Sequence, residues 1–530
     1  MGQKKYGNYV KASLWPYYPE IPVFQLLRDT AKRLPDKPAI LYPRRLTFRE
    51  LDLLSDRLAS ALDNLDICKN RKVALFLWNS PEFFISFLGI LKTGATVTAL
   101  NPSFKEKEAK YQIKDSESTT IILDEAQYPI LKGIRDELTG LENVIIIGEK
   151  RYTETYLLKD LLEINVNPPK VEIDPKKDIA VLQYTAGTTG LPKGCILTHF
   201  NIVTNVLQIL FPSLGKACED DIFLSHLPFY HIYGMTVQML SGIRLGASQL
   251  IQKRFEPKEF LGLIEKYRAT IVYTVMPVIN TLVNYPNLSK YDLSSLRFIN
   301  NGAVPIMLPI AKRFEELTGV TLTQGYGLSE ASPVTNFNPL TQIKLQSIGP
   351  PLPDTEEKIV DLKTGTKELP PGEVGELIIK GPQVMKGYWK RPLKTAKALR
   401  DGWLYTGDIA KMDEDGYVYI IDRKKEIIKY MGFTIGPAEL ESVLLEHQAV
   451  ADCAVVGKPD SIAVEIPKGF VLLKEGVKVT EEELIRFVEE RVAGYKKIRE
   501  IEFVDTIPRN LAGKVLRRVF IEKERAARVI

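Results

Sequence analysis

The sequence predicts an α/β fold with three parts: a large N-terminal domain of parallel sheets wrapped by helices, a small barrel-like subdomain, and a small mobile α+β domain at the C-terminus. Two observations carry this prediction. Through the first ~420 residues, short apolar and β-branched runs alternate with helical patterns across loops containing Gly or Pro, an order typical of parallel sheets covered on both faces. The chain has 530 residues, which is too long for one ordinary hydrophobic core.

Local signals place the N-terminal elements. The apolar run at residues 73–78 predicts a buried strand. Ser80, Pro81 and Glu82 then supply an N-cap, a proline at the first helical position and a first-turn acid for a helix that ends near Gly94. Further strands are predicted at residues 119–123, 144–147, 179–184, 222–225, 270–275, 296–300 and 320–324.

The composition changes near residue 350. Proline-rich segments at residues 350–353 and 369–372 enclose short alternating runs such as 375–380, which predict the barrel-like subdomain at about residues 345–422. We expect the large domain at residues 1–422, a hinge at 423–425 and the small domain at 426–530. In the small domain, Thr480 and Glu483 form a capping box that begins a helix, and strands are predicted at 453–456, 470–473 and 501–504.

The composition also excludes several classes of protein. The 71 basic and 66 acidic residues are mixed along the chain, so we expect no binding to nucleic acid. The four cysteines lie far apart and only four histidines are present, so neither a disulfide framework nor a zinc cluster is expected, and a reducing, cytoplasmic location fits. The N-terminus has no apolar signal core, and polar residues interrupt the most apolar stretch, 73–91, so we expect no integral membrane association. A homodimer is left open.

The strongest local feature is a Gly- and Thr-rich loop at residues 184–194 (YTAGTTGLPKG), which lies between an apolar strand and the apolar pattern at 196–210. Glycines let backbone N–H groups approach phosphate oxygens, three threonine hydroxyls add donors, and Lys193 adds a positive charge. It is not a Walker A loop, because Pro192 stands where that pattern requires glycine. Composition alone fits an ordinary surface turn as well as a phosphate loop.

Further motifs follow in order along the chain. Taken singly, their residues support little: His231 among aromatic residues is more often packed in a core, and Glu330 after a loop is normally a surface residue. The charges at residues 422–429 fit a solvated cluster. The motifs lie at residues 227–234 (LPFYHIYG), 301–305 (NGAVP), 324–330 (QGYGLSE), 402–408 (GWLYTGD), 422–433 (DRKKEIIKYMGF) and 508–517 (PRNLAGKVLR).

The ordered series resembles the ANL superfamily of adenylate-forming enzymes, which comprises acyl-CoA synthetases, the adenylation domains of nonribosomal peptide synthetases and luciferases. The similarity covers nearly the whole chain. The loop at 184–194 is similar to the superfamily's Y-[ST]-[SG]-G-[ST]-T-G-x-P-K-G, and Ala186, Ser329 and Ala512 are departures from the usual motifs. Residues 229–234 carry no aspartate that would pair with an α-ammonium group. The resemblance is therefore to the AMP-forming acyl-CoA synthetase branch.

The resemblance implies that ATP, Mg2+ and coenzyme A are used. Lys514 would be the catalytic lysine of adenylation, and Glu330 with Thr185 would hold the metal. Tyr326 would stack on the adenine, while Asp408 and Arg423 would bind the ribose. The implied contacts to ATP or AMP are Thr185, Ala186, Gly187, Thr188, Thr189, Gly190, Lys193, Gly302, Ala303, Val304, Gln324, Gly325, Tyr326, Gly327, Leu328, Ser329, Asp408, Arg423 and Lys514.

The superfamily uses two orientations of the small domain, one for each half-reaction. By resemblance, Lys425 would be the hinge, and the second orientation would bring Lys429, Gly432 and Phe433 toward the acyl-adenylate along the path of coenzyme A, with Lys429 as a second catalytic lysine. The wall of the acyl pocket would include Phe229, His231, Tyr233, Val275, Met276, Pro277, Gly302, Gly327 and Val334.

The implied function is acid–CoA ligation. Attack of a carboxylate on the α-phosphorus of ATP gives acyl-AMP and pyrophosphate, and coenzyme A then accepts the acyl group. Because residues 324–330 lack the tryptophan that closes acetate and propionate pockets, a medium- to long-chain fatty acid or a related acid is expected. Alternatives are a luciferase-like or carrier-loading enzyme, and a non-catalytic nucleotide-binding relative. The presence of Lys514, Glu330 and the phosphate loop favours an enzyme.

Overall fold

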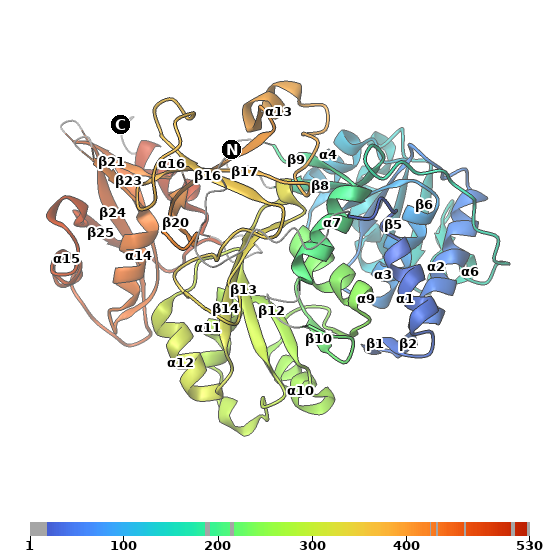
Figure 1. The fold of residues 1–530 in the computed structure, drawn as a ribbon, viewed down its shortest axis with the longest axis horizontal. Coiled ribbons are helices and arrows are strands. Elements are labelled where there is room, and N and C mark those ends of the chain that lie inside the picture. The colour runs from blue at the N-terminus through green and yellow to red at the C-terminus, as the bar shows by residue number, and fades with distance from the viewer. Residues whose placement is uncertain are drawn as a thin grey trace.

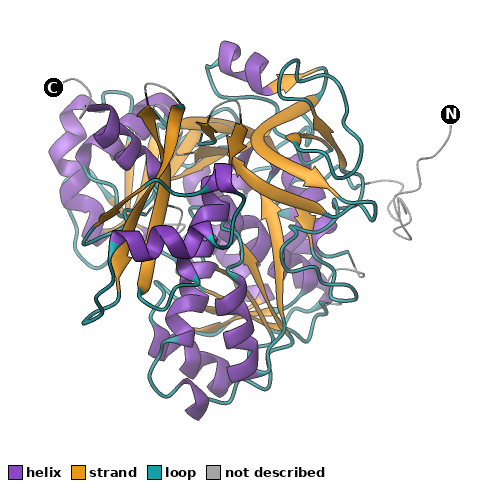
Figure 2. Cartoon of the chain, turned by 90° about the vertical axis from the view of Figure 1, so that its left-hand side faces the viewer, coloured by secondary structure: helices purple, strands orange, loops and turns teal. Residues whose placement is uncertain are grey.

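The computed structural model describes residues 18–185, 191–211, 217–423, 426–430, 433–460, 463–509 and 515–526. Within these ranges the strands form four sheets, of seven, eight, five and five strands. Figure 1 shows the seven-stranded sheet at the right, the strands β12 to β14 of the eight-stranded sheet below, and the last sheet at the left, with β16 and β17 between them. Figure 2 shows helices packed over the strands in a perpendicular view.

The seven-stranded sheet contains the strand before the phosphate loop. Its order is β7-β6-β5-β3-β4-β8-β9, and all neighbours are parallel except the edge pair β8 and β9. Parallel strands buried on both faces are made from continuous apolar runs, as in the buried stretch of β3. The strands are β3 (Lys72–Phe76), β4 (Thr96–Ala99), β5 (Thr120–Asp124), β6 (Asn143–Ile147), β7 (Tyr156–Leu157), β8 (Ile179–Thr185) and β9 (Lys193–Thr198).

The eight-stranded sheet has the order β15-β14-β13-β12-β10-β11-β1-β2. Only its edge pairs, β14 with β15 and β1 with β2, are antiparallel. The carboxyl ends of β10, β12, β13 and β14 therefore meet at one edge of the sheet. The strands are β1 (Pro38–Tyr42), β2 (Leu46–Thr47), β10 (Ile222–Ser225), β11 (Ser248–Ile251), β12 (Ile271–Val275), β13 (Phe298–Gly302), β14 (Leu322–Gly327) and β15 (Val334–Phe337).

Two smaller antiparallel-rich sheets follow. The first has its own small apolar core and matches the predicted barrel-like subdomain. The second belongs to the C-terminal α+β part, so the predicted fold class is confirmed. The strands are β16 (Glu356–Val360), β17 (Gly375–Lys380), β18 (Leu399–Arg400), β19 (Trp403–Met412) and β20 (Val418–Arg423), then β21 (Ile428–Tyr430), β22 (Phe433–Ile435), β23 (Val450–Asp460), β24 (Val464–Leu473) and β25 (Glu500–Phe503).

The helices follow the predicted caps. Ser80 accepts a hydrogen bond from the Phe83 amide at 3.2 Å, and Thr480 and Glu483 form the expected capping box. No helix within the described ranges is long and apolar enough to cross a bilayer. The helices are α1 (Gln25–Arg33), α2 (Phe48–Asp63), α3 (Pro81–Lys92), α4 (Glu106–Ser116), η1 (Glu125–Gln127), α5 (Tyr128–Ile134), η2 (Arg135–Glu137), α6 (Leu158–Leu161), α7 (His199–Ile209), the π-helix η3 (Tyr233–Leu240), α9 (Ser241–Leu245), α10 (Pro257–Tyr267), α11 (Met276–Val283), η4 (Leu288–Lys290), α12 (Leu308–Thr318), η5 (Ser329–Ala331), α13 (Pro392–Ala398), α14 (Pro437–Leu445), α15 (Glu481–Glu489), η6 (Gly494–Lys496) and α16 (Arg517–Ala526).

The apolar pattern at residues 196–210 divides into two elements. Its first residues complete strand β9, and helix α7 starts after Thr198. Thr198 and Asn201 form a reciprocal cap, in which each backbone amide donates to the other side chain, at 3.0 and 3.2 Å. The loop that begins at Thr185 is thus the connection of a β-hairpin, and the helix follows only after the return strand.

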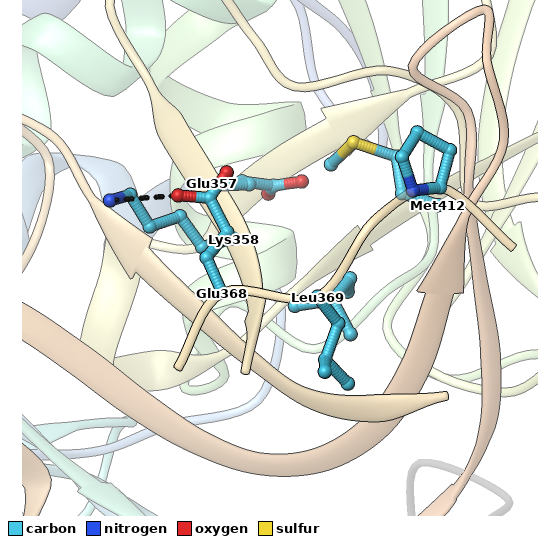
Figure 3. Close-up of a pocket in the computed structure, with 7 residues that line it drawn as sticks. Glu357, Lys358, Glu368, Leu369 and Met412 are labelled. Atoms are coloured by element: carbon cyan, nitrogen blue, oxygen red, sulfur yellow. Dashed lines mark ion pairs between the residues drawn. The ribbon is translucent and has the colours of Figure 1, made fainter. Parts of the chain in front are cut away.

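A half-buried glutamate with a shielded carboxyl oxygen lies in the small subdomain. Glu357 Oε2 on β16 accepts a hydrogen bond from the Asn336 side-chain Nδ2 at 3.0 Å, and Glu357 Oε1 is shielded from solvent with no hydrogen-bond partner among the described residues. Figure 3 shows it beside the Lys358–Glu368 ion pair and Met412, around a cavity of about 20 Å³, which is room for about one water molecule. A nucleotide or an acyl chain is far too large for this cavity.

Glu357 predicts a pH dependence of stability. Burial raises its pKa from 4.5 to about 8, so the folded protein keeps a proton that the unfolded chain releases. The contribution of protonated Glu357 to the free energy of unfolding is therefore complete below pH ~4.5 and is lost as the pH rises toward 8. Glu357→Gln should raise the melting temperature relative to the parent by about 2 °C or more at pH 8, and by less at pH 5. Calorimetry at both pH values checks this, and an equal difference at both would contradict it.

Candidate active site

The phosphate-loop motif is the tip of the hairpin formed by β8 and β9. Thr185 pairs with Lys193 across this hairpin, so the two residues face each other where the loop leaves the sheet. The intervening positions lie outside the described residues, and their phosphate contacts remain predictions. They are Ala186, Gly187, Thr188, Thr189 and Gly190.

Both ends of this loop are anchored to helix α4. The Tyr184 hydroxyl donates to Asp115 Oδ2 at 2.7 Å, and the Tyr111 hydroxyl donates to the Pro192 carbonyl at 2.8 Å. Burial and the Asp115 carboxylate raise the pKa of Tyr184 well above its ordinary value, so this phenol stays protonated and remains a donor. The backbone at the two ends of the loop is therefore fixed from one side.

Glu330, the predicted magnesium ligand, lies next to the phosphate hairpin. It is half-buried on η5, and its Oε1 accepts a hydrogen bond from the Tyr388 hydroxyl at 2.7 Å. Lys193 Nζ lies 3.8 Å from the centroid of the same Tyr388 ring. Sequence reasoning did not identify Tyr388, because no local pattern signals a contact to a residue 58 positions earlier.

A predicted adenine residue, Tyr326, and a predicted ribose residue, Asp408, also come together. The Tyr326 hydroxyl donates to Asp408 Oδ2, and Asp408 is 3% exposed on β19. Asp408 pairs in register with Arg423 on β20, whose side chain lies outside the described part of the chain. A buried, acceptor-only carboxylate beside a half-buried tyrosine suits a pair of sugar hydroxyls.

The predicted adenine loop follows β13. Ala303 adopts a left-handed conformation with φ of 64°, and the Val304 amide donates to the Gly302 carbonyl at 2.7 Å, which makes a tight turn. Gln324 Oε1 accepts a hydrogen bond from the Ile306 amide at 2.8 Å, so this buried side chain ties the two predicted adenine loops together. The remaining residues of the second loop are half-buried, as a cleft wall requires; they are Gly325, Tyr326, Gly327, Leu328 and Ser329.

The predicted acyl wall lies at the same strand ends. A Cβ added to Gly302 would meet the Tyr233 ring at 2.8 Å, so the close approach of this ring requires glycine. Tyr233 begins the π-helix η3, an irregularity often found at functional sites. Burial lowers the pKa of His231 to about 4, and its Nδ1 accepts a hydrogen bond from the Tyr233 amide at 3.2 Å. A neutral histidine fits a pocket wall.

Other predicted wall residues are less accessible. Phe229 is 0% exposed, and its ring packs 5.7 Å from Phe83 and 5.2 Å from Phe84, in the core around α3. Met276 and Val334 are also buried, at 2% and 7% exposure. Gly327 lies against the backbone of Pro333, whose carbonyl would be 2.3 Å from an added Cβ. Their contact with an acyl chain remains a prediction.

The structure describes only part of the predicted hinge and lid. Lys425, Gly432 and Lys514 lie outside the described residues, as do the side chains of Lys429 and Phe433 on β21 and β22. The loop that carries Lys514 joins Arg509 and Val515, whose backbones pair. The Arg509 side chain binds Asp452 through two hydrogen bonds of 2.6 and 3.0 Å, which anchors the base of this loop.

Comparisons with known proteins identify the family of the chain. The family model for AMP-binding enzymes matches residues 27–389, and the model for the AMP-binding enzyme C-terminal domain matches residues 439–514. The chain is 39% identical to a long-chain-fatty-acid–CoA ligase of Bacillus subtilis (strain 168), over 94% of each protein.

Solved structures give the same result. The anthranilate CoA ligase AuaEII in complex with anthranoyl-AMP superposes with a TM-score of 0.91 at 27% identity, over 97% of this chain and 99% of that one. MatB from Rhodopseudomonas palustris superposes with a TM-score of 0.87 in its ATP-bound form, at 28% identity over 95% and 99% of the two chains. The apo form of MatB gives 0.78, at 29% identity over 95% and 98%.

The fold and these matches define an adenylate-forming enzyme. The chain belongs to the AMP-binding enzyme family, in its AMP-forming acyl-CoA synthetase branch. The resemblance seen in the motifs is thereby confirmed, and so is acid–CoA ligation through acyl-AMP as the reaction class.

Proposed function

We propose that this acyl-CoA synthetase activates a medium- to long-chain fatty acid. The relative from Bacillus subtilis carries that specificity in its name and aligns with 94% of this chain. The predicted wall residues are uncharged apart from His231, and the low pKa of His231, about 4, keeps it neutral. An uncharged wall accommodates an aliphatic chain and offers no partner for an α-ammonium group.

One observation supports the proposal: the residues expected to bind the acid and those expected to bind the nucleotide follow the ends of two adjacent strands. Asn301 on β13 pairs in register with Gln324 on β14. Beyond these residues, β13 leads to Gly302 under the Tyr233 ring, and β14 leads to Tyr326 hydrogen-bonded to Asp408. A carboxylate bound at the first place would lie beside the nucleotide bound at the second, as adenylation requires.

In the proposed reaction, a carboxylate oxygen attacks the α-phosphorus of ATP and pyrophosphate leaves. Negative charge grows on the departing phosphates, and Lys193, the loop amides and Lys514 would stabilise it. The acyl-AMP then needs protection from water until the thiol of coenzyme A attacks its carbonyl carbon and AMP leaves.

The residues present fit a magnesium ion. Glu330 is a half-buried carboxylate, and only one of its oxygens is engaged by Tyr388, whose ring also contacts Lys193. Magnesium prefers oxygen ligands and takes only one or two from protein, so Glu330 with the Thr185 hydroxyl would be a sufficient donor set. When bound, the ion would neutralise phosphate charge.

We also propose that the unit after residue 425 rotates between the two half-reactions. The ATP-bound form of MatB superposes better than its apo form, with TM-scores of 0.87 and 0.78, which supports an arrangement close to that of the nucleotide-bound relative. Coenzyme A transfer would then use the other arrangement, with Lys429, Gly432 and Phe433 near the adenylate.

Pyrophosphate exchange with a panel of acids tests the substrate proposal. Radioactive pyrophosphate should enter ATP only with acids that form the adenylate, and exchange should be strongest with saturated acids of about eight to sixteen carbons, because each added buried CH2 contributes about 0.8 kcal/mol. Acetate and amino acids are the negative controls. Equal exchange with acetate and palmitate would contradict a long acyl pocket.

An aryl acid is the second candidate. The TM-score of 0.91 to AuaEII with anthranoyl-AMP favours it, and the Tyr233 ring could stack on an aromatic substrate. Including anthranilate, benzoate and 4-coumarate in the same panel decides between the two. Exchange with these acids alone would replace the fatty-acid proposal.

A further inference from the structure

We propose that Tyr388 is a positioning residue that holds Glu330 and Lys193 in one fixed arrangement around the phosphates of ATP. This inference rests on the proposed function, because it assigns those two residues to magnesium and phosphate. The hydroxyl of Tyr388 bonds Glu330 Oε1 at 2.7 Å, and its ring lies 3.8 Å from Lys193 Nζ.

Tyr388 is itself held firmly. The segment at residues 386–389 runs along β9: the Lys386 amide donates to the Ile196 carbonyl at 3.0 Å, and the Trp389 amide donates to the Gly194 carbonyl at 2.8 Å. The Tyr388 amide donates to Thr395 Oγ1 at 2.9 Å, and the residue is 8% exposed. The pairing fixes the backbone of Tyr388, and the burial of its ring together with the hydroxyl bond to Glu330 restricts the side chain.

The same segment also contacts Asp115, the residue that binds the other strand of the phosphate hairpin, β8. The Trp389 indole donates to the Asp115 carbonyl at 3.1 Å, and Arg391 forms an ion pair with the Asp115 side chain at 2.5 Å. Asp115 in turn accepts the Tyr184 hydroxyl just before the loop. Residues 386–391 therefore link Glu330 to both strands of the hairpin.

The two contacts of Tyr388 act on different groups. The hydroxyl engages one oxygen of Glu330 and orients the carboxylate plane, leaving the second oxygen for a metal. The ring faces Lys193 as a cation–π partner, which restricts the ammonium group without taking up its charge.

These contacts can be separated by substitution. Tyr388→Phe removes the hydroxyl and keeps the ring, whereas Tyr388→Leu removes both. Tyr417→Phe is the matched control, because the buried Tyr417 hydroxyl donates to the Gln342 carbonyl at 2.7 Å in the same subdomain, away from Glu330. Melting temperatures of all three variants establish that they fold.

Calorimetric titration with ATP, in EDTA and in magnesium, provides a readout independent of turnover. For Tyr388→Phe we expect unchanged ATP affinity in EDTA. The increase in ATP affinity that magnesium produces should be about 10-fold smaller than in the parent, the scale of one hydrogen bond to a charged group. For Tyr388→Leu we expect weaker ATP binding in EDTA as well, by about 3-fold, from the loss of the ring beside Lys193. In pyrophosphate exchange, Tyr388→Phe should raise the magnesium concentration for half-maximal rate.

Tyr388→Phe that matches Tyr417→Phe in its magnesium dependence would overturn the inference. Equal losses of ATP affinity in EDTA for Tyr388→Phe and Tyr388→Leu would also overturn it, since the hydroxyl would then act on ATP and not on Glu330. If the parent protein binds magnesium–ATP but exchanges pyrophosphate with no acid, the proposed function fails, while the binding titrations still decide the role of Tyr388.

Discussion

Replacing Lys514 by alanine is expected to slow acyl-adenylate formation by at least ~100-fold, the scale of losing one key charge-stabilising group. Attack of coenzyme A on preformed acyl-adenylate should be unaffected, because the proposed second arrangement moves this lysine out of the site. Rapid-quench measurement of adenylate formation, and separately of thiolysis from synthetic acyl-adenylate, checks both parts.

Lys514 itself lies outside the described residues, so its role stays a prediction. The residues that flank its segment are described: Arg509 pairs with Val515 through the backbone, and the Arg509 side chain donates two hydrogen bonds to Asp452. Lys478→Ala, which removes an exposed lysine of the same domain, is the control and should leave both rates unchanged. Equal loss of both half-reactions in Lys514→Ala would exclude two orientations.

Elements with local signals were predictable from the sequence. The strands at residues 222–225 and 375–380 coincide with β10 and β17, and the caps at Ser80 and Thr480 form as expected. The reason is that apolar runs and caps act over a few residues. The predicted nucleotide residues Tyr326 and Asp408 also meet, although only the family motifs connected them.

Contacts made by the folded topology could not be predicted. The residues of strand β9 belong to an apolar pattern that continues into helix α7. Only the pairing of β9 with β8 distinguishes the strand from the helix. Tyr388 meets Glu330 because its segment adds to the edge of β9. The packing of the Phe229 ring on α3 is a further contact of this kind, because it depends on partners far away in sequence; the contact of Phe229 with an acyl chain stays a prediction.

Arg517 connects the predicted lysine loop to the predicted hinge. It begins helix α16, three residues after Lys514, and is 8% exposed. Its guanidinium donates to both oxygens of Glu441, at 2.8 and 2.6 Å, forms an ion pair with Glu426, and lies 3.8 Å from Asp422. Asp422 and Glu426 stand on either side of the predicted hinge at 423–425, so one side chain neutralises carboxylates from both flanks.

Arg517→Met is therefore expected to destabilise the C-terminal part by about 3–5 kcal/mol, because it leaves buried carboxylates without a counter-charge. Both half-reactions should fall together, in contrast to Lys514→Ala. Arg518→Met is the matched control: the neighbouring side chain is 60% exposed and pairs only on the surface with Glu522, so its loss should change stability by no more than about 0.5 kcal/mol. Urea unfolding of the full chain, with hydrogen exchange followed in α14 and α16, measures both variants. If Arg517→Met unfolds at the same urea concentration as Arg518→Met, the contacts of Arg517 with these carboxylates do not contribute to the free energy of unfolding, and the proposed link between the lysine loop and the hinge is contradicted.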